Sequence, residues 1–321
     1  MKKVLVTYPI HREGLTGLFE RYDVTYCEEP MKKAHLASVI GEYDGVLAAG
    51  VRMTEAEMAA AGKLKVISVY GAGYDNVDTE AAARYGIVVA NIPDTVTEST
   101  AETAFGLMLS LMRRITECDR KIRNKTLKWG MMNNLGVNLY GKELGIVGMG
   151  RIGRAVAKRA AAFGMRISYY NRNRLDPAVE EECKAVYKGL DDLLQNADVV
   201  SLNAPLTPET WHLIGERELN LMKPSAFLVN TARGAVIDEK ALISHLQQGR
   251  IKGAALDVFE NEPRVPEELL ELDNVVLSPH LGTEATEVRI QMARDASQNI
   301  IDCLEGRKPL YVVNPSVYNS R

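Results

Sequence analysis

The sequence contains little cysteine, histidine or tryptophan, and it has no long apolar run. Its 321 residues include four cysteines, which stand far apart and form no CxxC pair: Cys27, Cys118, Cys183 and Cys303. That spacing argues against a zinc site or a disulfide framework and is typical of a reducing compartment. No run approaches the roughly 18 apolar residues that a membrane-spanning helix requires.

The surplus of charge is also small, with a formal net charge of −3. Such a balance gives no electrostatic case for nucleic acid or an anionic membrane as the main partner. The first residues, MKKVLVTYPIHREG, contain a short apolar run and no small-residue cleavage site, so they are more typical of a β-strand than of a signal peptide. We therefore expect a cytoplasmic protein with no nucleic-acid and no membrane partner.

The length of the chain favours two domains over one. In the first hundred residues, short β-branched runs alternate with helical patterns at 31–40 and 54–61, the second beginning with the capping-box pair Thr54 and Glu57. The expected strands here are Lys3–Thr7, Val24–Tyr26, Gly45–Ala48, Val66–Val69 and Ile87–Ala90. This alternation predicts a parallel sheet with helices on its faces.

A single long helix is expected over about Glu98–Ile122, because apolar residues recur on a wide face. That face fits a spine between domains, and it also fits a subunit interface. The alternating pattern restarts near Lys142, and an amphipathic closing helix is expected over Thr286–Glu305. The expected strands of the second part are 144–147, 166–171, Asp198–Leu202, Ala226–Asn230, Gly253–Asp257 and Val275–Ser278.

The segment GMGRIG at 148–153 follows the apolar strand 144–147 and opens a helical pattern at 151–163, which is the context a dinucleotide-binding glycine motif requires. Gly148 permits a tight turn, Gly150 lets backbone approach a pyrophosphate, and Gly153 lets helix and strand pack closely. Amides at the helix start, including those of Arg151 and Ile152, would face the anion. The alternative is a glycine-rich turn that binds nothing.

The end of the second strand, 18 residues beyond Gly153, carries Asn171 where these folds usually place a carboxylate. Arg172 and Arg174 stand beside it. A carboxylate would repel a 2′-phosphate, whereas guanidinium groups can bind one through two hydrogen bonds. This pattern favours NADP(H) and leaves NAD(H) possible; the alternative is that both arginines are solvated.

Three later stretches each end a predicted strand and enter a loop, the place where open parallel sheets bind ligands: LVNTARG, ALDVFENEP and LSPHLG. Arg233 supplies a fork suited to a carboxylate, Glu262 an acceptor, and His280 a proton with a reference pKa near 6.5. His212 is expected to be structural, at the start of a helix. Asp75 and Asp78 fit turn and cap positions, and no metal is expected.

With these four motifs in this order, the whole chain resembles the D-isomer-specific 2-hydroxyacid dehydrogenases. The resemblance implies that Arg233 binds the substrate carboxylate and carbonyl, that Glu262 orients His280, and that His280 donates the proton. It also implies that Ala72 and Gly73 touch substrate through backbone amides. The dinucleotide site would comprise Gly148, Met149, Gly150, Arg151, Ile152, Gly153, Asn171, Arg172, Asn173, Ala204, Pro205, Thr231 and Asp257, the last on the nicotinamide carboxamide.

The expected fold is therefore α/β, with two Rossmann-like or flavodoxin-like doubly wound parallel-sheet domains. A cofactor domain at 98–286 would be inserted in a substrate domain made of 1–97 and 287–321. The expected activity is NAD(P)H-dependent reduction of a small 2-keto acid, of the glyoxylate/hydroxypyruvate or 2-ketogluconate type, by a homodimer. The alternative is a dinucleotide-sensing binding protein or corepressor with the same fold.

Overall fold

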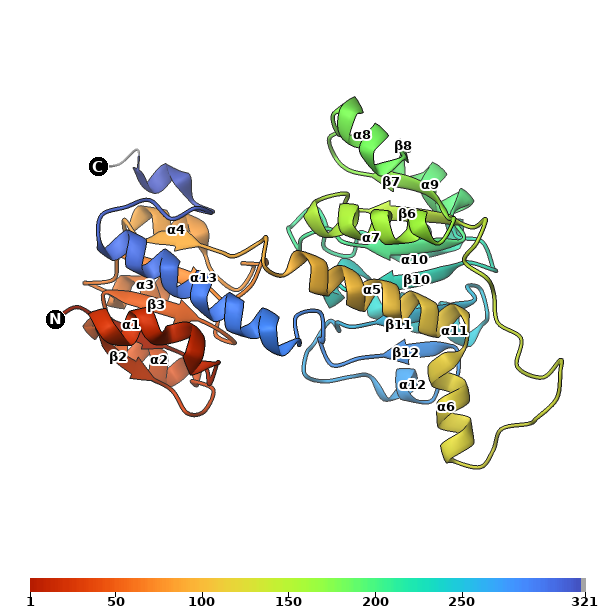
Figure 1. Cartoon of the computed structure of the whole chain (residues 1–321), viewed down its shortest axis with the longest axis horizontal. Helices are drawn as coiled ribbons and strands as arrows, with labels where there is room; N and C mark the ends of the chain where they lie inside the picture. The colour runs from red at the N-terminus through yellow and green to blue at the C-terminus, as the bar shows by residue number, and fades with distance from the viewer. Residues whose placement is uncertain (319–321) are drawn as a thin grey trace. The chain divides into compact units, whose positions relative to one another are not determined.

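A computed structural model describes residues 1–318, which divide into two compact units (Figure 1). The first unit consists of Met1–Val96 and the chain from Thr283 onward, and the second is Thr97–Gly282. Each contains one sheet whose paired strands all run parallel, with a hydrophobic core on both faces. The predicted α/β fold with two doubly wound parallel sheets is confirmed.

The first unit has a five-stranded sheet in the order β2-β1-β3-β4-β5. Its strands are β1 (Lys3–Val6), β2 (Asp23–Tyr26), β3 (Gly45–Ala48), β4 (Val66–Val69) and β5 (Val88–Ala90). Its helices are α1 (Thr16–Arg21), α2 (Lys33–Val39), α3 (Glu55–Ala60), α4 (Thr79–Arg84) and α13 (Thr286–Leu304), with 3-10 turns at Arg12–Leu15, Ile40–Glu42 and Pro315–Tyr318. Alternate strand residues face α1 and α13 on one side and α2, α3 and α4 on the other. All five predicted strands are present, within one residue at each end.

Two side chains fix helix starts in this unit as their sequence positions indicate. The amide and hydroxyl of Thr54 donate to Glu57 Oε2 at 2.7 and 2.6 Å, which confirms the capping box. Asp78 Oδ1 accepts from the amide of Ala81 at 2.9 Å and caps α4. Asp78 therefore has the structural role expected of it.

The second unit has a seven-stranded sheet in the order β12-β11-β10-β9-β6-β7-β8. Its strands are β6 (Glu143–Val147), β7 (Arg166–Tyr170), β8 (Ala185–Tyr187), β9 (Val199–Leu202), β10 (Phe227–Asn230), β11 (Gly253–Leu256) and β12 (Val275–Leu277). The helices that follow β6 are α7 (Arg151–Ala162), α8 (Pro177–Cys183), α9 (Leu190–Asn196), α10 (Glu216–Leu221), α11 (Glu239–Gln247) and α12 (Glu267–Leu270), with a 3-10 turn at Gly234–Val236. Strand β8, on the sheet edge, was not predicted.

The long helix predicted over Glu98–Ile122 is wrong: the chain forms α5 (Thr97–Met112) and α6 (Ile115–Arg123). Arg114 breaks it with a left-handed φ of 57°, and its guanidinium binds Glu117 through two hydrogen bonds of 2.7 and 2.6 Å. Helix α5 packs its apolar side on α7 and the sheet, whereas α6 buries no residue. Among the described helices, none is both long and apolar enough to cross a bilayer.

Candidate active site

In the turn between β6 and α7, two of the three motif glycines are packed closely against backbone and the third has open space around it. Gly148 has a φ of 96°, and a Cβ there would lie 2.5 Å from the amide nitrogen of Ala204. A Cβ on Gly153 would lie 2.4 Å from the carbonyl oxygen of Gly148. A Cβ on Gly150 would meet no atom within 4 Å. The turn thus leaves an open approach at Gly150, beside the first amides of α7, where an anion can bind.

Asn171 follows β7 and holds this turn in place. Its Oδ1 accepts from the amide of Met149 at 2.7 Å, while the Met149 side chain is fully buried. The Met149 amide therefore already has a partner, and the Asn171 side-chain oxygen is directed at the turn. Sequence reasoning placed both residues against the dinucleotide and did not foresee this contact between them.

The two arginines after β7 differ in their surroundings. Arg174 forms two 2.8 Å hydrogen bonds to Glu180, and it holds the pKa of that carboxyl at about 2. Arg172 and its neighbour Asn173 are exposed. Arg174 is therefore already paired with a residue of α8, which leaves Arg172 as the better placed of the two for a phosphate.

Two buried polar atoms near the turn lack a hydrogen-bond partner in the described part of the chain. They are Asn203 Oδ1, in the loop after β9, and Thr231 Oγ1, in the loop after β10. Ala204 and Pro205 continue the first of these loops. Buried polar groups rarely remain unpaired in folded proteins, so these atoms fit a site that is completed by a bound polar molecule such as a dinucleotide.

The loops after β11 and β12 bring Glu262 and His280 together. His280 Nδ1 lies 2.9 Å from Glu262 Oε2, and the amide of Phe259 donates to Glu262 Oε1 at 3.0 Å. Burial would raise the pKa of Glu262, but the hydrogen bonds from His280 and Phe259 outweigh it and lower that pKa. Glu262 thus lies against the imidazole with a lowered pKa, and its role in orienting His280 stays a prediction.

Arg233 lies in the loop after β10, the strand adjacent to β11. Its carbonyl accepts from Asn230 Nδ2 at 2.9 Å, and its Nη1 donates to the carbonyl of Ala232 at 2.8 Å. The positive charge of Arg233 also lowers the pKa of Glu262. Three neighbouring strands therefore deliver an arginine, a glutamate and a histidine to one edge of the sheet.

Asp257 shapes the loop that carries His280. Its buried Oδ1 accepts from Ser278 Oγ at 2.6 Å and from the amide of Leu281 at 2.7 Å, and its Oδ2 accepts from the amide of Gly282 at 2.9 Å. The backbone of His280 is left-handed, with a φ of 59°, and its amide donates to the Asp257 carbonyl at 2.8 Å. This role was missed; its contact with the carboxamide stays a prediction.

Ala72 and Gly73 belong to the other unit, in the loop after β4, where the Ala72 carbonyl accepts from Asn91 Nδ2 at 2.7 Å. His212 does not start a helix as predicted, since α10 begins only at Glu216. It lies in a loop with a left-handed φ of 49°, stacked on Trp211.

Comparison with known proteins identifies the family of the chain. The model of the "D-isomer specific 2-hydroxyacid dehydrogenase, NAD binding domain" matches residues 105–282. A glyoxylate reductase of Thermococcus litoralis is 44% identical in an alignment of 326 residues, which covers 99% of this chain and 98% of the relative.

Solved structures give the same result. A glyoxylate reductase from Paecilomyes thermophila aligns with a TM-score of 0.89 at 35% identity, covering 98% of both chains. An NADPH-dependent glyoxylate/hydroxypyruvate reductase from Sinorhizobium meliloti, in complex with NADP and malonate, aligns with a TM-score of 0.88 at 31% identity, covering 98% of this chain and 97% of the other. The chain therefore belongs to the D-isomer specific 2-hydroxyacid dehydrogenase family, whose members are oxidoreductases that act on CH–OH donors with a nicotinamide dinucleotide.

Proposed function

We propose that this protein reduces a small 2-keto acid to the D-2-hydroxy acid, with His280 as the proton donor. The observation that carries the proposal is the 2.9 Å contact between His280 Nδ1 and an ionised Glu262, within the electrostatic reach of Arg233. An acid, its orienting carboxylate and a carboxylate-binding guanidinium are the groups that this reaction requires.

Each side chain has a defined task in the proposed reaction. Arg233 binds the substrate carboxylate through two hydrogen bonds and polarises the keto oxygen. The hydride for the keto carbon would come from a reduced dinucleotide held at the Gly148–Gly153 turn of the second unit. The keto oxygen gains negative charge and takes the proton from His280 Nε2, while Glu262 stabilises the imidazolium from Nδ1. The products are the hydroxy acid, the oxidised dinucleotide and a neutral histidine.

The names of the relatives support glyoxylate or hydroxypyruvate as the substrate, and 2-ketogluconate is the competing choice. The direct test assays glyoxylate, hydroxypyruvate, pyruvate, phenylpyruvate and 2-ketogluconate, each with NADPH and with NADH. We expect the highest kcat/KM with glyoxylate or hydroxypyruvate. A protein that binds NADPH in a fluorescence titration but reduces none of these acids would instead be a dinucleotide-binding protein.

We further propose that NADP(H) is preferred and that Arg172 contacts the 2′-phosphate. The residue that follows β7 is Asn171 rather than a carboxylate, and the exposed Arg172 comes next. The NADP in the Sinorhizobium meliloti structure agrees with this choice. In the same proposal the second unit holds the dinucleotide and the first contributes the Ala72–Gly73 loop to substrate binding.

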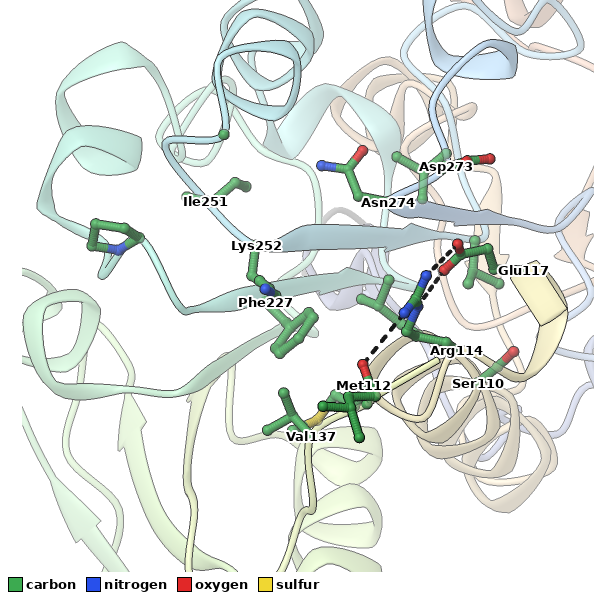
Figure 2. A pocket seen from close by; sticks show the side chains of 17 residues that line it. Ser110, Met112, Arg114, Glu117, Val137, Phe227, Ile251, Lys252, Asp273 and Asn274 are labelled. Carbon is green, nitrogen blue, oxygen red and sulfur yellow. Dashed lines mark hydrogen bonds and ion pairs between the residues drawn. The ribbon is translucent and has the colours of Figure 1, made fainter. Parts of the chain in front are cut away.

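We also propose a homodimer formed through the second unit. The segment 124–140, between α6 and β6, exposes large apolar side chains: Trp129, Met131, Met132 and Leu135 are 80%, 97%, 74% and 60% exposed. A cavity of about 540 Å³ lies at the amino ends of β10, β11 and β12. Met112, Val137 and Phe227 line it beside the Arg114–Glu117 pair (Figure 2). Large apolar side chains that are exposed together in one segment favour contact with a second copy of the chain.

Sedimentation of the wild type and of a Trp129→Ser/Met131→Ser variant tests this assembly. We expect a wild-type dimer that dissociates at a higher concentration in the variant. A wild type that sediments as a monomer at micromolar concentration would refute it.

A further inference from the structure

The loops that carry Arg233 and Glu262 touch each other through their backbones. A Cβ on Gly234, the residue after Arg233, would lie 1.9 Å from the carbonyl carbon of Phe259 and 2.3 Å from the amide nitrogen of Glu260. Phe259 in turn donates the amide that binds Glu262 Oε1 at 3.0 Å. The position of Glu262 therefore depends on the backbone at residues 259 and 260.

Glu260 is held from two directions by side chains outside the proposed mechanism. Its amide donates to Glu239 Oε1 at 3.2 Å, and its own Oε1 lies 3.3 Å from His212 Nε2. Glu239 is the first residue of α11 and is 9% exposed. His212 is stacked on Trp211 with ring centroids 4.6 Å apart. Glu239, at the start of α11, and His212, in a separate loop, thus both contact Glu260, which lies two positions before Glu262.

The loop that carries His212 is itself attached to the Arg233 loop. The amide of His212 donates to the carbonyl of Ala235 at 2.9 Å, and that of Ile214 donates to Val236 at 3.1 Å. The loops after β9, β10 and β11 therefore form one hydrogen-bonded group. A displacement at Glu260 would be passed to Glu262 because only one residue separates them.

Burial and the neighbouring charge both act on the pKa of Glu239. Burial raises the pKa of Glu239, and the neighbouring Glu260 carboxylate acts in the same direction, against the hydrogen bond from the Glu260 amide. Asp238, which caps α11 by accepting from Ala241, and His212 are the other titratable groups adjoining these two carboxyls. Among the hydrogen bonds and ion pairs described for these residues, none joins Glu239 to His280 or to Glu262.

We propose that Glu239 and His212 are positioning residues that fix Glu260 from two sides and thereby place Glu262 against His280. This inference rests on the proposed reductase function. It assigns Glu239 and His212 no contact with substrate or dinucleotide. What it requires of Glu239 is an acceptor for the Glu260 amide, and of His212 a ring nitrogen that reaches the Glu260 carboxylate.

The test measures kcat/KM for the preferred keto acid against pH in the full-length protein. Glu239→Ala removes the acceptor, and we expect kcat/KM to fall about 10-fold. As the pH rises, activity should be lost at a lower pH in this variant than in the wild type. The reason is that a displaced Glu262 stabilises the imidazolium less, which lowers the pKa of the proton donor. Glu239→Gln keeps an acceptor oxygen and should stay within about threefold of the wild type. Lys240→Ala, at the exposed neighbouring position, is the matched control.

A double-mutant cycle supplies a second measurement. His212→Phe keeps a ring against Trp211 and removes the nitrogen, and we expect a smaller loss of the same kind. Because both side chains act on Glu260, the Glu239→Ala/His212→Phe variant should lose little more than Glu239→Ala alone. Losses in kcat/KM that multiply would show independent effects and overturn the inference.

Other outcomes separate this inference from the function on which it rests. A lower melting temperature with an unchanged pH profile would make Glu239 merely structural and overturn the inference. His280→Ala, assayed in parallel, tests the reaction itself: a normal rate there would refute the proposed mechanism. An inactive His280→Ala beside a fully active Glu239→Ala would refute only the positioning role.

Discussion

The two edges of the seven-stranded sheet are built differently. At the carboxyl edge, side chains are tied to backbone: Asp257 to the His280 loop, and Glu262 to Phe259. At the amino edge, Glu117 forms salt bridges with Arg114 and Lys121 beside an open cavity (Figure 2). The cavity and the candidate catalytic groups thus lie at opposite ends of the same strands. Empty volume therefore does not mark the edge at which the candidate catalytic groups lie.

The largest expected effect lies at the carboxyl edge. His280→Ala removes the proposed proton donor, so kcat should fall by about 10²–10⁴ while NADPH still binds. Steady-state rates and a fluorescence titration of NADPH measure the two quantities. Lys252→Ala, at the exposed rim of the amino-edge cavity, should leave kcat unchanged; equal losses in both variants would remove the distinction between the edges.

Gly234→Ala tests whether the contact between the Arg233 and Glu262 loops is essential. Because the new Cβ would stand 1.9 Å from the carbonyl carbon of Phe259, one loop must shift. We expect kcat/KM to fall about 10²-fold, the loss typical of a 1 Å misplacement. Gly62→Ala is the control, since a Cβ there meets no atom within 4 Å. Activity that survives in Gly234→Ala would mean that the loops tolerate separation.

Arg172→Ala should raise the KM for NADPH about 10-fold and leave that for NADH nearly unchanged, because only NADPH carries the 2′-phosphate. Arg174→Ala should act less selectively, since Arg174 is paired with Glu180. Initial rates with both dinucleotides decide the matter. Equal changes for the two would exclude Arg172 from phosphate binding.

The smallest effect is expected at the amino edge, in stability rather than catalysis. Arg114 and Lys121 hold the pKa of the Glu117 carboxyl at about 2. A lowered pKa stabilises the fold above the unfolded value of about 4.3, and that contribution is lost as the pH falls toward 2. Glu117→Gln should therefore lower the free energy of unfolding by about 1–2 kcal/mol at pH 7, after allowance for solvent screening.

Urea unfolding of the wild type and of Glu117→Gln at a series of pH values measures this difference. It should shrink between pH 4.5 and 2, while kcat at pH 7 stays unchanged. A difference that is constant with pH would contradict the ionic explanation.

Short apolar runs bounded by turn residues were enough to predict most strands, because a strand buried on both faces has a continuous apolar pattern. Strand β8 escaped because it is a three-residue edge strand whose Val186 is 62% exposed. The break at Arg114 escaped because the helical pattern continues across it, and the contacts of Arg114 with Glu117 and Leu135 depend on the packed fold.

The site was predictable in residue type and only partly in role. Strand ends locate Arg233, Glu262 and His280, since parallel strands deliver their following loops to one edge. The partners of Asn171 and Asp257 could not be inferred, because their hydrogen bonds join segments 22 and 24 residues away in sequence. Which backbone amide a side chain meets depends on the packed fold and not on local pattern.

The hydrogen bonds that Asp257 accepts from the His280 loop anchor that loop to the second unit. The last of these hydrogen bonds reaches Gly282, the final residue of the second unit, and the first unit resumes at Thr283. The imidazole is thus anchored by residues of the second unit alone. The separation of the acid from its carboxylate therefore does not depend on the course of the chain from Thr283 onward.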